Sequence, residues 1–397
     1  MESKSEPEKK EEEIEVEEYH EAITDPNEIK LLEEFKQSFS KITEKKDLEV
    51  IDQNAISDND IMIHFLRAKK LNVKKATRMI LDYFHWKRKI NLDDLYLNFK
   101  LEQKNKIKII FPHCFHKYAK DGSPIYIQIM GKLNVDEIFK IETPENLCIY
   151  SALINERMER EYFKTCSKIK KRYVHGVFNI IDFRDIKMTH LLSKKLLSYL
   201  KDSFGILQDC YPECLSGSYI LNAGFAFRAF YSAVSIFLDA KTRDKIRVYG
   251  EDYQVHLLEK IDSDCLPYFF GGSCQCPNKG GCLFSNAGPW QTEEDRNEEN
   301  TLPEDIINAR IELNNYMMTG VKVKEVKKEE KKEEKKEEKK EEKKEEKKIN
   351  EDNKQKEEKK EEIKEEKLEE KNENKEKKEE IKEEKGEKEV ENKGESK

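Results

Sequence analysis

The sequence lacks the features of membrane-spanning and secreted proteins. Among its 397 residues, no apolar run approaches the roughly 20 residues that a membrane-spanning helix requires. Met1 leads directly into charged residues, so we expect no signal peptide. The nine cysteines are an odd number scattered through a long chain, which favours reduced thiols in the cytosol. We therefore expect a cytoplasmic protein whose contact with membranes is peripheral and transient.

Motifs of covalent and phosphate chemistry are absent as well. The chain has neither the GxSxG motif of serine hydrolases nor the GxxxxGK[ST] loop that cradles nucleotide phosphates. Cys274, Cys276 and Cys282 lie close together in sequence, and Cys265 would complete four zinc ligands. Their spacing matches no common zinc module, so reduced core thiols are favoured over a metal site. We expect no enzyme activity, no metal or cofactor, and no nucleic-acid partner.

Charged residues dominate both ends of the chain. Residues 1–21 are acidic, and residues 321–397 are almost entirely lysine and glutamate. Such segments bury too little apolar surface to offset the entropy lost on ordering. The KKEE repeat over 327–348 places like charges four residues apart, which opposes a helix. We expect a mostly solvated, partly helical tail and a folded part over 22–320.

The folded part divides by pattern into a helical segment, an α/β segment and a last helix. Apolar residues recur at helical spacing in 22–98, whereas strand and helix patterns alternate in 99–290. A linker and a helix follow in 291–320. The predicted helices are 26–42, 58–70, 73–90, 144–166, 190–208, 225–238, 253–261 and 303–318. The predicted strands are 124–131, taken as the first of the sheet, then 175–183, 219–221, 246–249 and a short one at 280–284.

The helix predicted at 225–238 is unusual because apolar residues surround most of its circumference. These residues are Phe225, Phe227, Phe230, Tyr231, Val234, Ile236, Phe237 and Leu238. A helix of this kind is either buried on every side or in contact with lipid. It is too short to cross a bilayer, and it contains Arg228. Pattern alone leaves two interpretations open: a core helix, or a movable wall over an apolar cavity with a charged rim at 239–245.

Several stretches together resemble the CRAL-TRIO family, in particular its phosphatidylinositol transfer proteins. They are FLRAKKLNV (65–73), KDGSPIYIQIMG (120–131), FNIIDF (178–183), YPECLSGSYILNAGFAF (211–227), FLDAKTRDKI (237–246) and LPYFFGGSCQCPNKGGCLFSNAGPW (266–290). Their fixed order makes the resemblance more specific than any single motif. It implies an α/β fold: a small helical N-terminal lobe, then a mixed, largely parallel sheet whose flanking helices enclose a hydrophobic lipid pocket.

The resemblance also assigns roles to residues. It implies that 225–238 is the gate of the pocket, that Gly271 and Gly272 form a hinge, and that Tyr126 lines the pocket. The positions that bind the phosphoinositol head group in the family are held here by Lys69, Lys70, Glu213, Thr242 and Lys245. The family usually has arginine where Lys69 stands, and lysine cannot make the bidentate phosphate contact that arginine makes.

The positions that hold phosphatidylcholine in the family are mostly changed. Tyr126 matches a choline-contacting tyrosine. Phe115, Asn155, Val177 and Asn179 stand where the family has two tyrosines, a serine and a threonine. Because choline is held by aromatic faces and its phosphate by hydroxyl groups, we expect phosphatidylinositol binding with weak phosphatidylcholine binding.

The function expected from these observations is phospholipid binding and transfer between membranes, with phosphatidylinositol favoured. The resemblance further suggests Golgi or endosomal membranes and presentation of the lipid to a phosphoinositide kinase. Two alternatives remain: a pocket for a sterol or tocopherol-like ligand, and an interaction scaffold with a vestigial pocket. The lysines at the pocket mouth weigh against the first.

Overall fold

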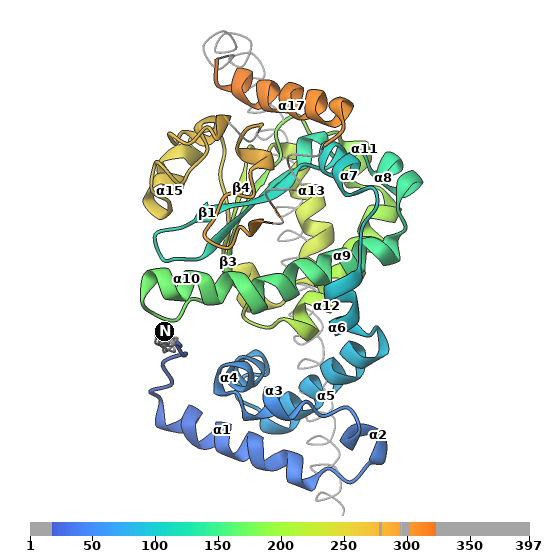
Figure 1. The fold of residues 1–397 in the computed structure, drawn as a ribbon, viewed down its shortest axis with the longest axis vertical. Coiled ribbons are helices and arrows are strands. Elements are labelled where there is room, and N and C mark those ends of the chain that lie inside the picture. Colours follow the sequence, from blue (N-terminus) through green and yellow to red (C-terminus); the bar gives the residue numbers. More distant parts are fainter. Residues whose placement is uncertain (1–17, 278–279, 294, 296–301, 323–397) are drawn as a thin grey trace, which may run out of the picture. The chain divides into compact units, whose positions relative to one another are not determined.

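The computed structural model describes residues 18–277, 280–293, 295 and 302–322. The predictions for residues 1–17 and for the lysine- and glutamate-rich tail from residue 323 onward lie outside this part of the chain. Within the described residues the fold is the expected α/β arrangement, with helices first and a mixed sheet after them (Figure 1). No helix in these residues combines the length and the apolar character that crossing a bilayer requires.

The N-terminal lobe is built on three amphipathic helices, as predicted. They are α1 (Pro26–Ser38), α4 (Asn59–Ala68) and α5 (Val73–Lys89). The carboxylate of Asp58 caps α4 by accepting hydrogen bonds from the amides of Asp60 and Ile61. Phe35, Ile63 and Ile80 from the three helices are fully buried together. The periodicity did not predict the short helices α2 (Lys45–Leu48) and α3 (Gln53–Ser57) between α1 and α4, nor α6 (Leu92–Asn98), which follows α5.

The sheet has five strands in the order β1-β2-β3-β4-β5. They are β1 (His113–Tyr118), β2 (Pro124–Ile129), β3 (Val177–Asp182), β4 (Leu215–Leu221) and β5 (Ile246–Val248). Only β1 runs antiparallel to its neighbour, so the sheet is mixed and largely parallel. The prediction that 124–131 holds the first strand is wrong, because β1 precedes it.

The prediction of a short strand at 280–284 is also wrong. Cys282–Phe284 forms a 3-10 turn (η7), which begins after Gly281 at a φ of 97°. All three side chains are buried in one cluster. A strand would point consecutive side chains to opposite faces, and only a tight turn lets three in a row enter the same core.

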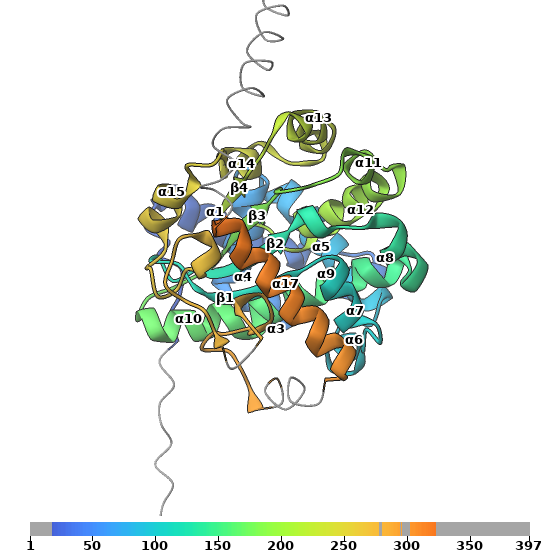
Figure 2. The ribbon, with the colours of Figure 1, turned by 90° about the horizontal axis from the view of Figure 1, so that it is seen from above.

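The helices of the second lobe flank the sheet (Figure 2). Before the gate region they are α7 (Lys104–Ile110), α8 (Val135–Ile141), α9 (Pro144–Arg157), a π-helical segment (Met158–Tyr162), α10 (Phe163–Lys170), α11 (Met188–Leu191) and α12 (Lys194–Cys210). After it they are α13 (Phe225–Val234) with a 3-10 turn (Ser235–Phe237), α14 (Ala240–Asp244), α15 (Tyr253–Lys260), a 3-10 turn (Tyr268–Phe270) and α17 (Glu304–Lys322).

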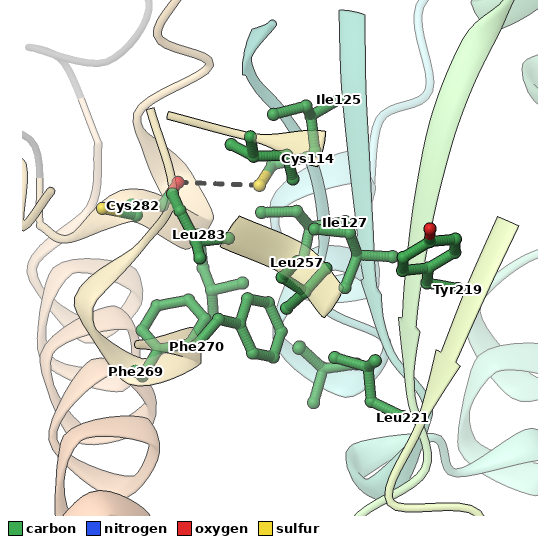
Figure 3. Close-up of a cluster of buried hydrophobic side chains, with 14 of the residues drawn as sticks. Cys114, Ile125, Ile127, Tyr219, Leu221, Leu257, Phe269, Phe270, Cys282 and Leu283 are labelled. Carbon is green, nitrogen blue, oxygen red and sulfur yellow. Dashed lines mark hydrogen bonds between the residues drawn. The ribbon is translucent and has the colours of Figure 1, made fainter. Parts of the chain in front are cut away.

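One face of the sheet is closed by the C-terminal part of the chain. Alternate residues of β2 and β4, among them Ile127 and Leu221, contact Leu257 of α15, Phe270 and Leu283 (Figure 3). Leu313 and Met317 of α17 join this cluster, so the last helix packs back on the domain. Leu221, Leu257, Phe270 and Leu283 are fully buried. This face is therefore a solid core.

The other face is covered less tightly. Tyr126, Gln128, Asn179 and Ile181 alternate with the core residues of β2 and β3, and each keeps partial exposure. Their neighbours come from α9, α12 and α13, where partly buried side chains such as Tyr150, Leu200 and Tyr231 lie beside buried ones. The two faces thus differ in how completely helices cover them, as expected of a fold that binds a ligand on one side of its sheet.

Candidate functional site

A charged cluster lies where β4 begins and α14 ends. The ammonium of Lys241 lies 2.9 Å from one oxygen of Glu213, and that of Lys245 lies 3.7 Å from the other. Lys245 also donates a 2.6 Å hydrogen bond to the carbonyl of Leu215. Two cations therefore share one carboxylate, and these three side chains together carry one excess positive charge.

Local structure fixes these side chains. Asp239 caps α14 by accepting a 3.0 Å hydrogen bond from the amide of Thr242 and a 2.6 Å bond from its hydroxyl. The Thr242 hydroxyl is thus engaged within its own helix. Lys241 donates to the carbonyl of Arg67 at 3.2 Å, which joins α14 to the end of α4.

A cavity of about 230 Å³ opens beside this cluster. It is lined by Glu21, His64, Arg67, His175, Glu213, Leu215, Ser216 and Lys245. Glu213 and Lys245 of the predicted head-group residues line it, whereas Lys69, Lys70 and Thr242 do not. Lys69 is half-buried and Lys70 exposed at the end of α4, and neither ammonium has a hydrogen-bond or ion-pair partner among the described residues. They are cations available beside the cavity.

Arg67 is a lining residue that the sequence analysis missed. Its guanidinium donates two hydrogen bonds to Glu28, at 2.8 and 2.7 Å, and one to Glu21 at 3.0 Å. The hydrogen bonds from Arg67 lower the pKa of the Glu28 carboxyl. The arginine is visible in the FLRAKKLNV motif, but its partners lie 39 and 46 residues away and no sequence signal identifies them.

Two stacked histidines form the back of this region. The rings of His64 and His175 have centroids 4.0 Å apart, and the Nε2 atom of His175 lies 3.0 Å from Glu159. Burial lowers the pKa of His64 to about 3. Burial opposes charge on His175 and Glu159 too, but their mutual attraction raises the pKa of His175 and lowers that of Glu159 to about 2. His64 is therefore neutral at neutral pH, whereas Glu159 keeps His175 protonated to a higher pH than an isolated histidine.

This arrangement predicts a pH-dependent effect of Glu159→Gln on stability. The unperturbed pKa values are 4.5 for Glu159 and 6.5 for His175, so the pair stabilises the fold fully between these values. Its contribution is lost as the pH rises through the raised pKa of His175. Urea unfolding should show a larger loss for the variant near about pH 5.5 than near about pH 9. The exposed Glu145→Gln is the control, and an equal loss at both pH values would contradict the assignment.

A second, larger hollow of about 550 Å³ is lined by the helical lobe together with the helix that runs from α9 to α10. Acidic and basic residues form part of its lining, among them Lys87, Asp93, Glu156 and Arg160. None of the gate residues line this hollow. Charged side chains in its walls make it a poorer site for acyl chains than a wholly apolar pocket.

The gate helix buries one side and exposes another. Phe227, Phe230 and Val234 are buried, and the rings of Phe227 and Phe230 lie 4.9 and 5.7 Å from that of Phe183. Tyr231, Phe237 and Leu238 are half-buried, and Ile236 is 73% exposed. The side chain of Phe225 lies outside the described part of the structure. The apolar circumference is therefore divided between a packed inner side and a solvent-facing end.

Three tyrosines meet beneath this region. Tyr126 of β2 lies near enough to Tyr150 and Tyr199 for their phenols to interact electrostatically, and burial raises its pKa well above the usual value. All three nevertheless keep partial exposure. Surrounding protein thus crowds the phenol of Tyr126, although each of the three residues keeps some exposed surface.

The residues at the choline positions have other contacts. The ring of Phe115 lies 4.7 Å from that of Tyr126, and the amide of Asn155 donates to the carbonyl of Ser151 at 2.8 Å. Val177 is buried. The side-chain oxygen of Asn179 is buried without a partner among the described residues. None of these four residues offers a hydroxyl group to a phosphate.

The predicted hinge is a tight turn. Gly271 has a φ of 96°, in the left-handed region, and a Cβ on Gly272 would lie 1.9 Å from the carbonyl oxygen of Leu266. Both positions therefore require glycine for local reasons. Whether this turn also moves as a hinge stays a prediction.

The helical lobe, the mixed sheet with one loosely covered face and the cationic mouth together define a two-lobed α/β protein of the ligand-binding kind. The chain belongs to the CRAL/TRIO family. The CRAL/TRIO domain matches residues 111–272, and the CRAL/TRIO N-terminal domain matches residues 31–82. The recognition made from the motifs is confirmed.

Among its relatives is the Sec14 cytosolic factor of Schizosaccharomyces pombe, 32% identical over 237 residues, which cover 60% of this chain and 82% of that protein. Another is the phosphatidylinositol/phosphatidylcholine transfer protein SFH7 of Arabidopsis thaliana, 35% identical, of which the match covers 43%. The crystal structure of Sfh5 superposes with a TM-score of 0.53 at 16% identity, over 70% of this chain and 98% of that one. This last likeness shows the fold alone.

Proposed function

We propose that the protein binds one phospholipid and transfers it between membranes, with phosphatidylinositol as the favoured cargo. The observation that carries this proposal is the cationic mouth, where Lys241 and Lys245 converge on Glu213 beside a cavity of about 230 Å³. Cations suit the phosphodiester, and the carboxylate can accept hydrogen bonds from inositol hydroxyls. The relatives named as phosphatidylinositol/phosphatidylcholine transfer proteins support the same class of cargo.

The loosely covered face of the sheet supports a site for acyl chains. Each methylene group withdrawn from a bilayer costs about 0.8 kcal/mol unless apolar surface buries it again. Ile181, Leu200 and Phe204 offer partly exposed apolar surface on the side where α13 lies. We propose that acyl chains pack against this surface and complete the burial of these side chains.

The gate helix supports an exchange mechanism. Phe227 and Phe230 seal the interior in this conformation, whereas the exposed Ile236 can enter the apolar part of a membrane. Opening on a bilayer would transfer the apolar contacts of the helix from the core to lipid, so little apolar surface would meet water. The protein would thereby act as a peripheral membrane protein, and presentation of its cargo to a phosphoinositide kinase is part of the same proposal.

Mass spectrometry of lipids that co-purify with the protein tests the proposal directly. We expect phosphatidylinositol in near-equimolar amount. If a sterol or a tocopherol-like molecule is found instead, that molecule and not a phospholipid is the cargo. Protein that carries no lipid and cannot be loaded from vesicles would refute the proposal.

We expect the unmodified protein to transfer phosphatidylcholine weakly. Transfer should improve when the side chains that the family has at the four choline positions are restored. The variant combines Phe115→Tyr, Asn155→Tyr, Val177→Ser and Asn179→Thr, and it gives the choline phosphate donors that the present side chains lack. Transfer of labelled phosphatidylcholine and phosphatidylinositol is measured side by side. We expect phosphatidylcholine transfer to rise while phosphatidylinositol transfer is kept. Efficient phosphatidylcholine transfer by the unmodified protein would contradict the prediction.

A further inference from the structure

Three thiols and an imidazole gather at the edge of the sheet, away from the charged mouth. His116 lies on β1, Cys274 and Cys276 lie in the loop after Tyr268–Phe270, and Cys282 begins η7. Their potential ligand atoms all lie within 4.8 Å of one another. The sequence analysis weighed Cys265 as the fourth ligand of such a group, but the structure brings His116 to it instead.

The spacing of these atoms fits a tetrahedral metal centre. Zinc–sulfur bonds of about 2.3 Å at tetrahedral angles separate two sulfurs by roughly 3.8 Å, and a sulfur from an imidazole nitrogen by roughly 3.6 Å. The sulfurs of Cys274 and Cys276 are 3.6 Å apart. The remaining pairs need to contract by at most about 1.2 Å to reach bonding geometry. This contraction is within the reach of side-chain rotation.

The surroundings of His116 point independently to a ligand. Its side chain is fully buried, and its Nδ1 atom lies 3.1 Å from the hydroxyl of Ser285. That hydroxyl also lies 3.1 Å from the carbonyl oxygen of Cys282 and donates to it, so it accepts from the imidazole. The Nε2 atom is buried with no partner among the described residues. A buried polar atom left unpaired costs free energy, and a metal ion bound to Nε2 would remove this cost.

The hydrogen bond from Nδ1 to Ser285 is the second contact that metal-bound histidines usually make. It fixes the tautomer that leaves Nε2 with a free lone pair, and it holds the plane of the ring. Ser285 lies three residues after Cys282, so the same turn that places a thiol also orients the imidazole. One short segment thus supplies both a ligand and the support for another.

We propose that His116, Cys274, Cys276 and Cys282 bind one zinc ion as a structural site. Thiolate and imidazole ligands select zinc over magnesium or calcium, and four protein ligands leave no open position for catalysis. Three thiolates and a neutral imidazole give the centre one net negative charge. The ammonium of Lys117, which forms a hydrogen bond with Cys274, lies in place to balance it.

The ion would join two parts of the chain that are distant in sequence. His116 belongs to the edge strand of the sheet, and the cysteines follow more than 150 residues later. Closing so long a loop restricts the unfolded chain and stabilises the fold. Figure 3 shows the sulfur of Cys282 turned away from the apolar cluster that holds Leu283 and Phe270. Cys282 is buried in this cluster, and Cys274 and Cys276 pack against it, so the thiols lie at the border of the core.

Metal content of the full-length protein, purified without chelators and without a polyhistidine tag, tests the proposal. Elemental analysis should find one zinc per chain. The double variant Cys274→Ser/Cys276→Ser should fall to background zinc and melt at a lower temperature. Cys148→Ser, which removes a half-buried thiol outside the group, should keep both values of the unmodified protein.

A spectroscopic measurement on the unmodified protein tests the site even if the double variant fails to fold. Replacement of zinc by cobalt(II) should give the intense thiolate-to-cobalt and tetrahedral d–d absorption of a site with three sulfur ligands. Protein without metal after refolding in zinc, or a disulfide among these thiols in the freshly isolated protein, would overturn the proposal. Equal zinc content in the double variant and in Cys148→Ser would overturn it as well. Because these readouts involve no lipid, they stand apart from the test of phospholipid transfer.

Discussion

Replacing Lys245 with alanine is expected to lower phosphatidylinositol transfer by about 10- to 100-fold. A hydrogen bond to a charged group contributes about 1.5–3 kcal/mol, and each 1.4 kcal/mol is a factor of ten in affinity. Lys245 is the predicted head-group cation that both lines the cavity and contacts Glu213. Its removal would leave Glu213 paired only with Lys241 and would reduce the positive charge that attracts the phosphate.

Two further variants separate charge from structure in this experiment. Lys245 also donates to the carbonyl of Leu215, so alanine removes a contact of the fold as well. Lys245→Gln keeps a hydrogen-bond donor while it removes the charge, and it should lose transfer with a smaller loss of thermal stability. Lys89→Ala removes an exposed lysine at the end of α5 and should leave transfer unchanged. Wild-type transfer by Lys245→Gln would contradict the assignment.

Lys69 and Lys70 are tested by the same assay. Neither lines the cavity, yet both stand at the end of α4 beside it. If they bind the phosphodiester of the head group, the double alanine variant should reduce transfer without a loss of stability, since neither has a partner to lose among the described residues. Comparing the loss of transfer in this variant with that in Lys245→Ala would show which lysines contribute most to head-group binding.

The periodic elements of the fold could be predicted from sequence, and the elements that depend on tertiary contacts could not. Apolar alternation in β2 was readable, because its inward isoleucines contrast with Tyr126 and Gln128. The strand β1 has the sequence HCFHKY, which gives no such pattern. Its histidines are buried only because α9 and the segment after Cys282 close over them, as the contacts of His113 with Tyr150 and of His116 with Ser285 show.

The candidate site divides in the same way. The motifs identified Glu213 and Lys245, and the structure brings their side chains together. Sequence could not reveal the contact of Lys241 with Arg67 or the stacking of His64 on His175. Each joins residues far apart in the chain, and no local sequence pattern indicates such pairs. The cluster of His116, Cys274, Cys276 and Cys282 could be predicted only in part. The three cysteines were visible, but His116 lies on the strand that the sequence did not predict.

The largest loss of stability is expected from Asp182→Ala. Asp182 ends β3, is fully buried and pairs with the guanidinium of Arg184, to whose amide it also binds at 3.0 Å. It accepts a further 2.7 Å hydrogen bond from Asn222, in the turn between β4 and the gate helix. Removing one partner of a buried ion pair costs about 3–5 kcal/mol, because the other charge is left uncompensated.

Urea unfolding of a graded series measures this effect. Asn222→Ala removes one hydrogen bond to the same carboxylate and should cost about 1.5–3 kcal/mol, while the exposed Asp202→Ala should change the free energy of unfolding by less than about 0.5 kcal/mol. A loss for Asp182→Ala no larger than that for Asn222→Ala would mean that Arg184 finds another partner. The two variants also differ in function. Asn222→Ala keeps the Asp182–Arg184 pair and loosens the turn before α13, so faster lipid exchange at modest loss of stability would identify that turn as the point about which the gate opens.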